Sequence, residues 1–322
     1  MDKFKILSLD GGGVRGYLTA IFLKKIEEHL NHKYKEEIPL GLRFDLIAGT
    51  STGGIIAGLL SIGTTAAEIL RMYESDIPAI FSAKMQTNTL STLWKSKYSS
   101  QVLIQKAEKY FTDPSTQIPL TFADVQTDLL ITSVDLTTAK PRFHKSDYMA
   151  RNRSRLDEKL SSAILGSTAA PTYFQAVSSK YAKSLIDGGI AANNPSLVAL
   201  IDALQFERSS KRGNQKPISI TDTLLLSIGT GQIGEVPYNV NKLSNGGKLD
   251  WAKPISDILM ESQSQLAAYQ THFLYQLHNA PYLRINPQLM TKMQLDDATS
   301  IALLKSIADL DQTQFNFIDQ NF

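Results

Sequence analysis

Short hydrophobic runs alternate along the chain with longer segments in which apolar residues recur every three or four positions. The short runs predict buried strands, at residues 3–9, 44–48, 128–136, 182–186 and 223–228. The longer pattern predicts amphipathic helices at residues 17–30 and 196–206, with further helical segments after the last strand. Strands that alternate with helices indicate an α/β fold with a largely parallel sheet that is covered on both faces.

Candidate chemistry begins where the second strand ends. Ser51 stands in a Gly-x-Ser-x-Gly pattern between Gly49 and Gly53, after the run 44–48 and before the apolar stretch 55–60. A strand, a tight turn and a helix would expose the Ser51 hydroxyl at the end of the sheet, as in a nucleophile elbow. The same small residues also occur wherever a strand and a helix pack closely, so the pattern is weak alone.

A glycine-rich segment, residues 10–16 (Asp-Gly-Gly-Gly-Val-Arg-Gly), separates the first strand from the first helix. Backbone N–H groups at such a turn suit an anion, either a phosphate or an oxyanion. The segment also matches a dinucleotide fingerprint, but the acidic residues at the expected distance, Glu36 and Glu37, fall in a polar loop. Arg15 either adds positive field to the anion or ties down the loop.

A third element follows the fourth strand, where Asp187 precedes Gly188 and Gly189. Two glycines allow close approach to another loop, which suits a base, although Asp-Gly alone is more often a turn. Ser51, Asp187 and the glycine segment all follow predicted strands. We therefore expect them to converge at one end of the sheet.

Together these stretches resemble the patatin-like phospholipase family. Residues 49–53 resemble its nucleophile elbow, residues 187–189 its Asp-Gly-Gly motif, and residues 169–174 and 193–195 further family stretches. The glycine segment resembles its oxyanion-hole motif, with Gly11, Gly12, Gly13, Arg15 and Gly16. The resemblance implies a three-layer α/β/α fold, a catalytic domain over residues 1–230 and a C-terminal helical extension over residues 231–322.

The resemblance also implies a lipid acyl hydrolase with a Ser51–Asp187 dyad that cleaves carboxylic esters of membrane phospholipids, without a metal or cofactor. The chain is similar to effector phospholipases of antiphage systems, which implies a cyclic-nucleotide activator. A non-catalytic module that binds a phosphate-bearing ligand and an acyl-transferase on the same dyad are the alternatives. His144 is the candidate for a conventional triad, but the order Ser…Asp…His does not favour it.

Composition adds limits. The 322 residues contain no cysteine, which excludes disulfides and thiolate chemistry, and the net charge of +2 does not favour a nucleic-acid polymer as partner. No run approaches the roughly 18 apolar residues of a transmembrane helix, so we expect a cytoplasmic protein that acts peripherally on the membrane.

Two further segments could contact a ligand or a membrane. The cationic stretch 140–159 is either a solvated surface or a phosphate contact, and the segment 77–98 is either a lid or a core-covering insertion. The segment 229–247 is the expected hinge.

Overall fold

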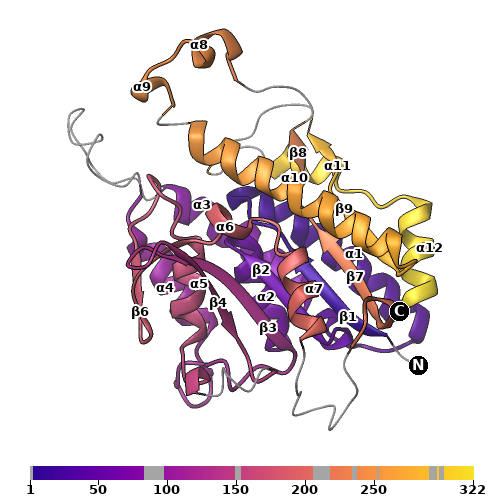
Figure 1. Ribbon diagram of the computed structural model, residues 1–322. Coiled ribbons are helices and arrows are strands. Elements are labelled where there is room, and N and C mark those ends of the chain that lie inside the picture. The colour runs from indigo at the N-terminus through magenta and orange to yellow at the C-terminus, as the bar shows by residue number, and fades with distance from the viewer. Residues whose placement is uncertain are drawn as a thin grey trace.

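The computed structural model describes residues 3–82, 98–148, 154–205, 218–233, 238–251, 254–289, 296 and 301–322. Its centre is an eight-stranded sheet (Figure 1) with the order β5-β6-β3-β2-β1-β7-β9, and β4 pairs with β3 beside this path. Five strands run parallel to one another: β3 (Asp128–Asp135), β2 (Leu46–Thr50), β1 (Phe4–Leu9), β7 (Thr223–Ile228) and β9 (Tyr282–Ile285). The antiparallel pairs involve β4 (Lys140–Lys145), β5 (Val177–Ser179) and β6 (Ala182–Asp187), and a separate small sheet pairs β8 (Gln232–Ile233) with β10 (Gln288–Leu289).

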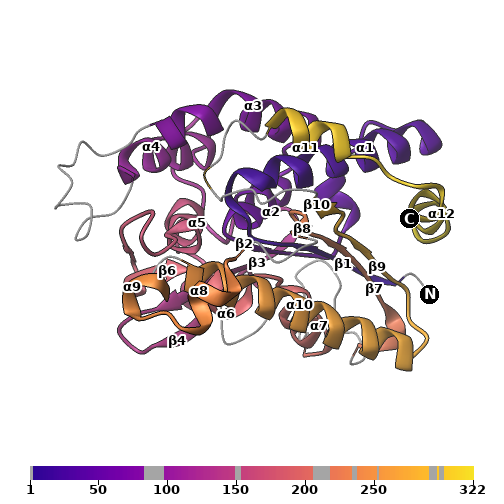
Figure 2. The ribbon, with the colours of Figure 1, turned by 90° about the horizontal axis from the view of Figure 1, so that it is seen from above.

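Helices cover both faces of the sheet, as the view from above shows (Figure 2). One layer contains α1 (Gly16–Tyr34), α2 (Thr52–Ser61), α3 (Ala66–Ser82), α4 (Ser100–Tyr110), α5 (Leu160–Thr168) and α11 (Ile301–Ile307). The other contains α6 (Gly189–Ala192), α7 (Ser196–Leu204), α8 (Val240–Ser244), α9 (Lys248–Trp251) and α10 (Pro254–Leu277), while α12 (Gln312–Asn321) lies at the β9 side. The three-layer α/β/α prediction is confirmed.

The central strands are buried on both faces, which explains their nearly continuous hydrophobic sequences. In β1, Leu7 and Leu9 belong to the core beneath α1 and α2, whereas Phe4 and Ile6 belong to the core beneath α7. All four side chains are at most 2% exposed. The alternation along the strand therefore separates two cores and does not separate core from solvent.

The chain after residue 230 differs from the expectation of helices alone. Strand β9 lies in this part and pairs with β7 in parallel, so the segment extends the central sheet. The start of the expected hinge is also tied to this strand, because the Gly229 N–H donates to the Ile285 carbonyl at 2.8 Å. A four-residue strand is too short to show a period of its own, which is why the sequence pattern missed it.

No helix in the described ranges combines the length and the apolar character that crossing a bilayer requires.

Candidate active site

Ser51 occupies a sharp turn between β2 and α2. Its backbone has φ 52° and ψ −122°, a conformation that non-glycine residues rarely adopt. The Ser51 N–H donates to the Ser167 hydroxyl at 2.8 Å, and its carbonyl accepts the first N–H groups of α2, from Gly54 at 2.8 Å and Ile55 at 3.1 Å. Strained backbone of this kind persists where surrounding contacts hold it, and it concentrates at functional sites.

The flanking glycines allow the close packing that this turn needs. A Cβ atom on Gly53 would lie 2.3 Å from the Leu9 carbonyl oxygen, and one on Gly49 would lie 2.3 Å from the Gly53 carbonyl oxygen. Both neighbours are backbone atoms that cannot move aside. Glycine is therefore needed at both positions, because any side chain there would keep α2 from packing against the end of β1 and against the turn itself.

Asp187 lies directly beside the serine. The Ser51 hydroxyl donates to Asp187 Oδ2 at 2.7 Å, and the Gly189 N–H donates to the other carboxylate oxygen at 2.7 Å. Burial, with Asp187 only 2% exposed, raises the pKa of its carboxyl to about 6, although these two hydrogen bonds oppose the rise. A carboxylate with this pKa is a better proton acceptor than an ordinary aspartate and is still largely ionised at neutral pH.

Ser51 and Asp187 converge as expected, but for Asp187 the reason was wrong. Strand β6 runs antiparallel to β3, so the rule that parallel strands end at one edge does not apply to it. The pairing register brings Asp187 opposite Ser133, one residue beyond Thr132, which itself pairs with Thr50. The stagger of β6 against the last residues of β3 therefore places Asp187 level with the elbow.

The glycine segment borders the same place. Gly12 and Gly13 line the cavity at Ser51, and Gly13 has φ 59°, a left-handed conformation that favours glycine. The Gly11 N–H donates to the Asn193 carbonyl at 3.0 Å, and the Gly11 carbonyl accepts the Thr230 hydroxyl at 3.0 Å. The two bonds hold Gly11 through both its N–H and its carbonyl, so the Gly11 N–H is already engaged.

Arg15 and Gly16 belong to the same segment but do not line the Ser51 cavity. The Arg15 Nη1 donates to the Gly231 carbonyl at 3.4 Å, and its side chain lines a separate cavity. A Cβ atom on Gly16 would lie 2.2 Å from the Thr52 hydroxyl, so Gly16 lets α1 start against the elbow. Of the two roles considered for Arg15, these contacts do not support a direct action on an oxyanion at Ser51.

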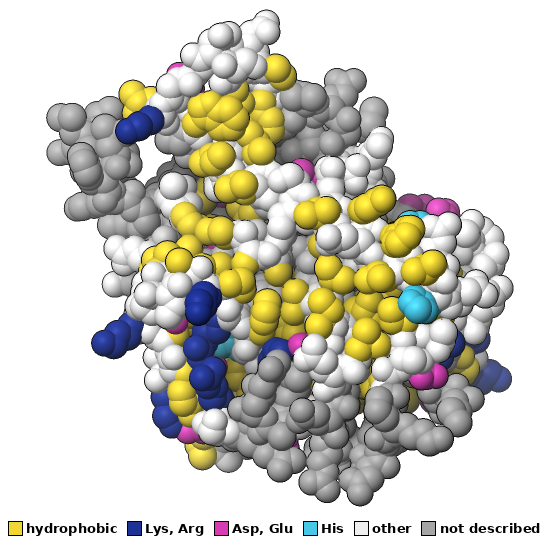
Figure 3. Space-filling view, in the orientation of Figure 1, with side chains coloured by type: hydrophobic (Ala, Val, Ile, Leu, Met, Phe, Trp, Pro, Cys, Tyr) yellow, Lys and Arg dark blue, Asp and Glu magenta, His cyan; other side chains and the backbone are white. Residues whose placement is uncertain are grey.

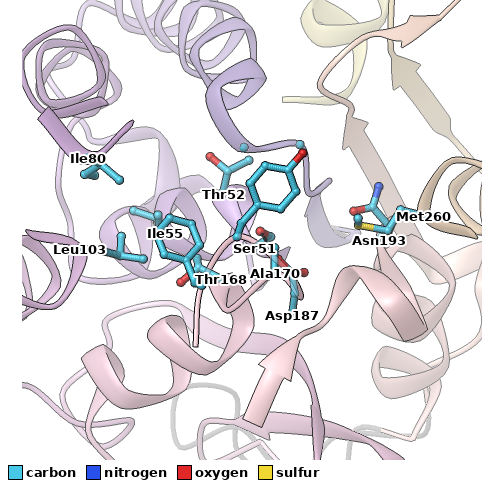
Figure 4. A pocket seen from close by; sticks show the side chains of 14 residues that line it. Ser51, Thr52, Ile55, Ile80, Leu103, Thr168, Ala170, Asp187, Asn193 and Met260 are labelled. Atoms are coloured by element: carbon cyan, nitrogen blue, oxygen red, sulfur yellow. Dashed lines mark hydrogen bonds between the residues drawn. The ribbon is translucent and has the colours of Figure 1, made fainter. Parts of the chain in front are cut away.

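The cavity at Ser51 is small and is lined mostly by apolar side chains (Figure 4). Its volume is about 60 Å³, and a neighbouring cavity of about 40 Å³ shares part of its lining. Figure 4 shows Ser51 and Asp187 in the centre. Ile55, Ile80 and Leu103 lie to one side of them, and Asn193 and Met260 lie to the other. The apolar side chains common to both cavities are Ile55, Ile80 and Leu103.

His144 lies elsewhere, in a buried chain of hydrogen bonds. Its Nε2 lies 2.8 Å from the Ser133 hydroxyl and its Nδ1 lies 2.9 Å from Glu158 Oε2. Ser133 is fully buried and His144 is 3% exposed, so a substrate has no access to either. The sequence alternative of a triad through His144 therefore has no support in the geometry.

Two other regions singled out in the sequence are described only in part. The cationic stretch is not one surface, because Lys145 is buried in an ion pair with Asp202 at 2.5 Å; Arg151 and Arg153 lie outside the described residues. Most of the segment 77–98 lies outside them as well. Glu36 and Glu37 are exposed after α1 and do not follow a strand. The described residues contain no group of three His, Asp or Glu side chains that could hold a metal.

Sequence reasoning missed the residues that hold the motifs in place. Ser167, which binds the Ser51 N–H, carries no motif of its own. Thr230 was noted only as part of a loop, and Asn193 only as part of a family stretch. Each acts through a contact that spans more than 100 positions along the chain. Only the tertiary structure brings them to the site.

Comparison with known proteins shows which family this chain resembles. The profile of the family described as Patatin-like phospholipase matches residues 7–200. Patatin-like protein 1 of Arabidopsis thaliana is 30% identical, over 94% of this chain and 80% of that protein. A cGAMP-activated phospholipase of Escherichia coli is 34% identical over 72% of this chain and 63% of that protein, and Patatin-2-Kuras 4 of Solanum tuberosum is 27% identical over 92% and 83%. The chain belongs to the patatin-like phospholipase family, a family of lipid hydrolases.

Proposed function

We propose that the protein is a serine acyl hydrolase that cleaves carboxylic esters of membrane phospholipids through Ser51 and Asp187. The observation that carries this proposal is the 2.7 Å hydrogen bond from the Ser51 hydroxyl to Asp187, in the wall of a mostly apolar cavity. A nucleophile within hydrogen-bonding distance of a base, with the base itself fixed by a second bond, is the arrangement that activates a serine. Here the Gly189 N–H fixes the base.

The chemistry follows from these contacts. Asp187 takes the Ser51 proton as the Ser51 oxygen attacks the ester carbonyl, and it returns that proton to the departing alcohol, which leaves as the lysolipid. A water molecule then gives its proton to Asp187 and attacks the acyl-serine. The fatty acid leaves, the proton returns to Ser51, and both residues are restored.

Stabilisation of the oxyanion falls to the backbone of the glycine segment. Gly12 and Gly13 border the cavity beside Ser51, whereas the Gly11 N–H is engaged by the Asn193 carbonyl. We therefore assign the oxyanion hole to the N–H groups of Gly12 and Gly13, with Gly11 as the residue that anchors them. Loss of one such donor typically lowers the rate about 10²- to 10³-fold.

The lining of the cavities supports a fatty-acyl substrate. Beyond Ile55, Ile80 and Leu103 the neighbouring cavity continues between α3, α4 and α5 to Phe111 and Leu165. An acyl chain gains free energy when it leaves water for such a surface, by about 0.8 kcal/mol per buried methylene. The apolar path starts at the nucleophile, so it suits the chain that becomes esterified to Ser51.

Access to a membrane surface is supported by the outer face of α10. Large apolar side chains on this helix are exposed to solvent: Leu259, Leu266, Tyr269, Phe273 and Leu277. Figure 3 shows hydrophobic side chains on the face of the molecule where α10 lies in Figure 1. Exposed apolar side chains in this number mark an interaction surface. Met260 of the same helix lines the Ser51 cavity, so the helix connects this face with the site.

We also propose a cyclic-nucleotide activator, since a 34% identical relative is a cGAMP-activated phospholipase. The test is thermal stability and hydrolysis in the presence of a panel of cyclic di- and trinucleotides. An activator raises both the unfolding temperature and the hydrolysis rate. If no member of the panel changes either quantity, this part of the proposal is wrong and the hydrolase assignment is unaffected.

The hydrolase proposal is tested with purified protein and phospholipid vesicles, with fatty acids and lysolipids identified by mass. We expect release by the wild type and by Ser61→Ala, since Ser61 is a buried serine of α2 whose hydroxyl donates to the Gly58 carbonyl of its own helix. We expect neither product from Ser51→Ala. A fluorophosphonate probe separates the alternatives, because a binding module would not be labelled at Ser51. An acyl-transferase would give acylated alcohol when an acceptor is added.

A further inference from the structure

A second cavity borders the glycine segment. It has a volume of about 150 Å³ and is lined by Asp10 and Arg15 of that segment, whereas the Ser51 cavity is lined by Gly12 and Gly13. The rest of its wall comes from the turn after β7, from α10 and from residues at and after β9, and most of it is polar. We call it the Arg15 cavity.

The two arginines of this cavity are paired very differently. Arg284 donates to both carboxylate oxygens of Asp10 and to the Ser227 hydroxyl. Arg15 is only 8% exposed, yet among the described residues its guanidinium makes a single hydrogen bond, to the Gly231 carbonyl at 3.4 Å, and its Nε has no partner. No carboxylate in the described part of the chain lies within 4.0 Å of it.

A buried guanidinium with this little compensation is costly. Unsatisfied buried donors typically cost about 1–3 kcal/mol each, and charged ones cost more. Burial also lowers the pKa of Arg15, which reflects the same loss of solvation. Native structures retain such a group where a strain, a catalytic role or an unfilled ligand site explains it.

The chemistry of the cavity indicates which ligand would supply the missing acceptors. A guanidinium binds phosphate oxygens through parallel N–H groups, and it is the side chain best suited to that geometry. Asn286 lines the same cavity and accepts the Gly231 N–H through its Oδ1, so the group that it has left for an anion is its amide nitrogen, a donor. A volume of about 150 Å³ is several times the roughly 30 Å³ share of one water molecule. It therefore suits a group of phosphate size.

The negative charges nearby are consistent with one anion. Asp10 is compensated by Arg284, which leaves two carboxylates of α10 that would repel an anion: Glu261 on the wall, and Asp257, which interacts with Arg15 through space. Glu261 accepts a hydrogen bond from the Gln265 side chain at 2.9 Å and interacts with Arg15 only through space. A bound anion would replace Glu261 as the main counter-charge of Arg15.

We propose that the Arg15 cavity binds an anionic ligand with a phosphate group, either free phosphate or the phosphate of a larger molecule, and that Arg15 is its principal cation. The site is independent of whether Ser51 is the nucleophile. Arg15 lies two residues after Gly13. The ligand would therefore bind against the segment that forms the proposed oxyanion hole.

The test is calorimetric titration of the full-length protein with inorganic phosphate, glycerol 3-phosphate and adenosine 5′-monophosphate. Gln265→Glu and Gln270→Glu form a matched pair: both glutamines are exposed on α10, but only Gln265 lines the cavity. One added charge within several ångströms of the anion should weaken binding about tenfold or more for Gln265→Glu, with less than about a twofold effect for Gln270→Glu. Glu261→Gln should tighten binding, and Arg15→Gln should abolish it.

Saturable binding that follows this order supports the site, and the tightest of the three compounds identifies the source. Preference for glycerol 3-phosphate indicates a lipid headgroup, and preference for the nucleotide or for phosphate indicates a soluble ligand. If none of the three binds the wild type, or if both glutamate variants weaken binding equally, the proposal is overturned. The comparison of Gln265→Glu with Gln270→Glu tests the proposed site even if Arg15→Gln does not fold.

Discussion

The Ser51 hydroxyl donates a 2.7 Å hydrogen bond to Asp187, 136 positions away along the chain. The bond joins a serine held at φ 52° to a carboxylate that is 2% exposed, so each residue is in an environment that is unfavourable for it alone. The pairing relates the activity of this protein to its stability, because the burial that makes Asp187 a base also makes its charge costly.

The pH dependence of hydrolysis should report Asp187. Burial raises its pKa to about 6, and only the ionised form accepts the Ser51 proton. We expect kcat/KM to rise about tenfold per pH unit below pH 6 and to level off above it. Initial rates on a soluble ester between pH 4.5 and 8 measure this limb. A limb centred near pH 4 would show that the site does not raise the pKa of Asp187.

Replacing Asp187 by asparagine should abolish hydrolysis and stabilise the fold at neutral pH. A pKa raised from 3.8 to about 6 means that the folded state holds the proton more tightly than the unfolded chain. The wild type is therefore stabilised below pH 3.8 and loses that contribution as the pH rises to 6. The change corresponds to about 3 kcal/mol. We expect Asp187→Asn to exceed the wild type by up to about that amount at pH 7.5.

Urea unfolding at pH 7.5 and at pH 4 measures this difference, which should shrink at the lower pH. The matched control is Asp202→Asn. Asp202 is also buried, but it pairs with Lys145 at 2.5 Å. Removing its charge takes away the Asp202 half of a buried ion pair and should destabilise the fold by about 3–5 kcal/mol. Equal effects of the two substitutions would contradict the assignment of an unpaired, costly carboxylate at position 187.

The sequence predicted the central strands and singled out Ser51 and Asp187, which the structure brings together, because these predictions depend on local patterns. Continuous apolar runs mark strands that are buried on both faces, and the glycines at 49 and 53 mark a close approach of backbones. Strand direction is not local: β6 is antiparallel, and only its register against β3 brings Asp187 to Ser51. The partners Ser167 and Thr230 were missed for the same reason, since each contributes one hydroxyl from a distant element.

Ser167→Ala should weaken the elbow without removing a catalytic group. The substitution leaves the Ser51 N–H without its 2.8 Å acceptor in a partly buried place, which should cost about 1 kcal/mol of stability. We expect slower reaction of Ser51 with a fluorophosphonate probe, because its backbone is less firmly held. Ser61→Ala serves as the control, because Ser61 is also buried and its hydroxyl donates within its own helix, to the Gly58 carbonyl. Identical labelling rates for the two variants would show that Ser167 does not position Ser51.

The dyad assignment predicts that the buried chain at His144 is dispensable for chemistry. Ser133→Ala removes the hydroxyl that contacts His144 Nε2 and leaves the pair of His144 with Glu158 in place. We expect this variant to be labelled at Ser51 at the wild-type rate, whereas Ser51→Ala is not labelled at all. Mass spectrometry of the labelled peptide identifies the site. Labelling at Ser133 in the wild type, or loss of Ser51 labelling in Ser133→Ala, would contradict the dyad.

Adjacent glycines of α2 give the sharpest steric test of the elbow. A Cβ atom on Gly53 would lie 2.3 Å from the Leu9 carbonyl oxygen and 2.6 Å from that of Asp10, and neither backbone atom can yield without moving the glycine segment. On Gly54 the nearest atom would be the Ser167 hydroxyl at 3.4 Å, which is an ordinary contact. Gly53→Ala should therefore lose about 1–3 kcal/mol of stability and most of the Ser51 labelling. Gly54→Ala should be neutral or gain about 0.5–1 kcal/mol, because alanine favours a helix more than glycine does. Thermal unfolding and probe labelling of the two variants, side by side, measure both effects. If Gly53→Ala is as stable and as reactive as Gly54→Ala, the close approach of α2 to the end of β1 is not what holds Ser51 beside the glycine segment.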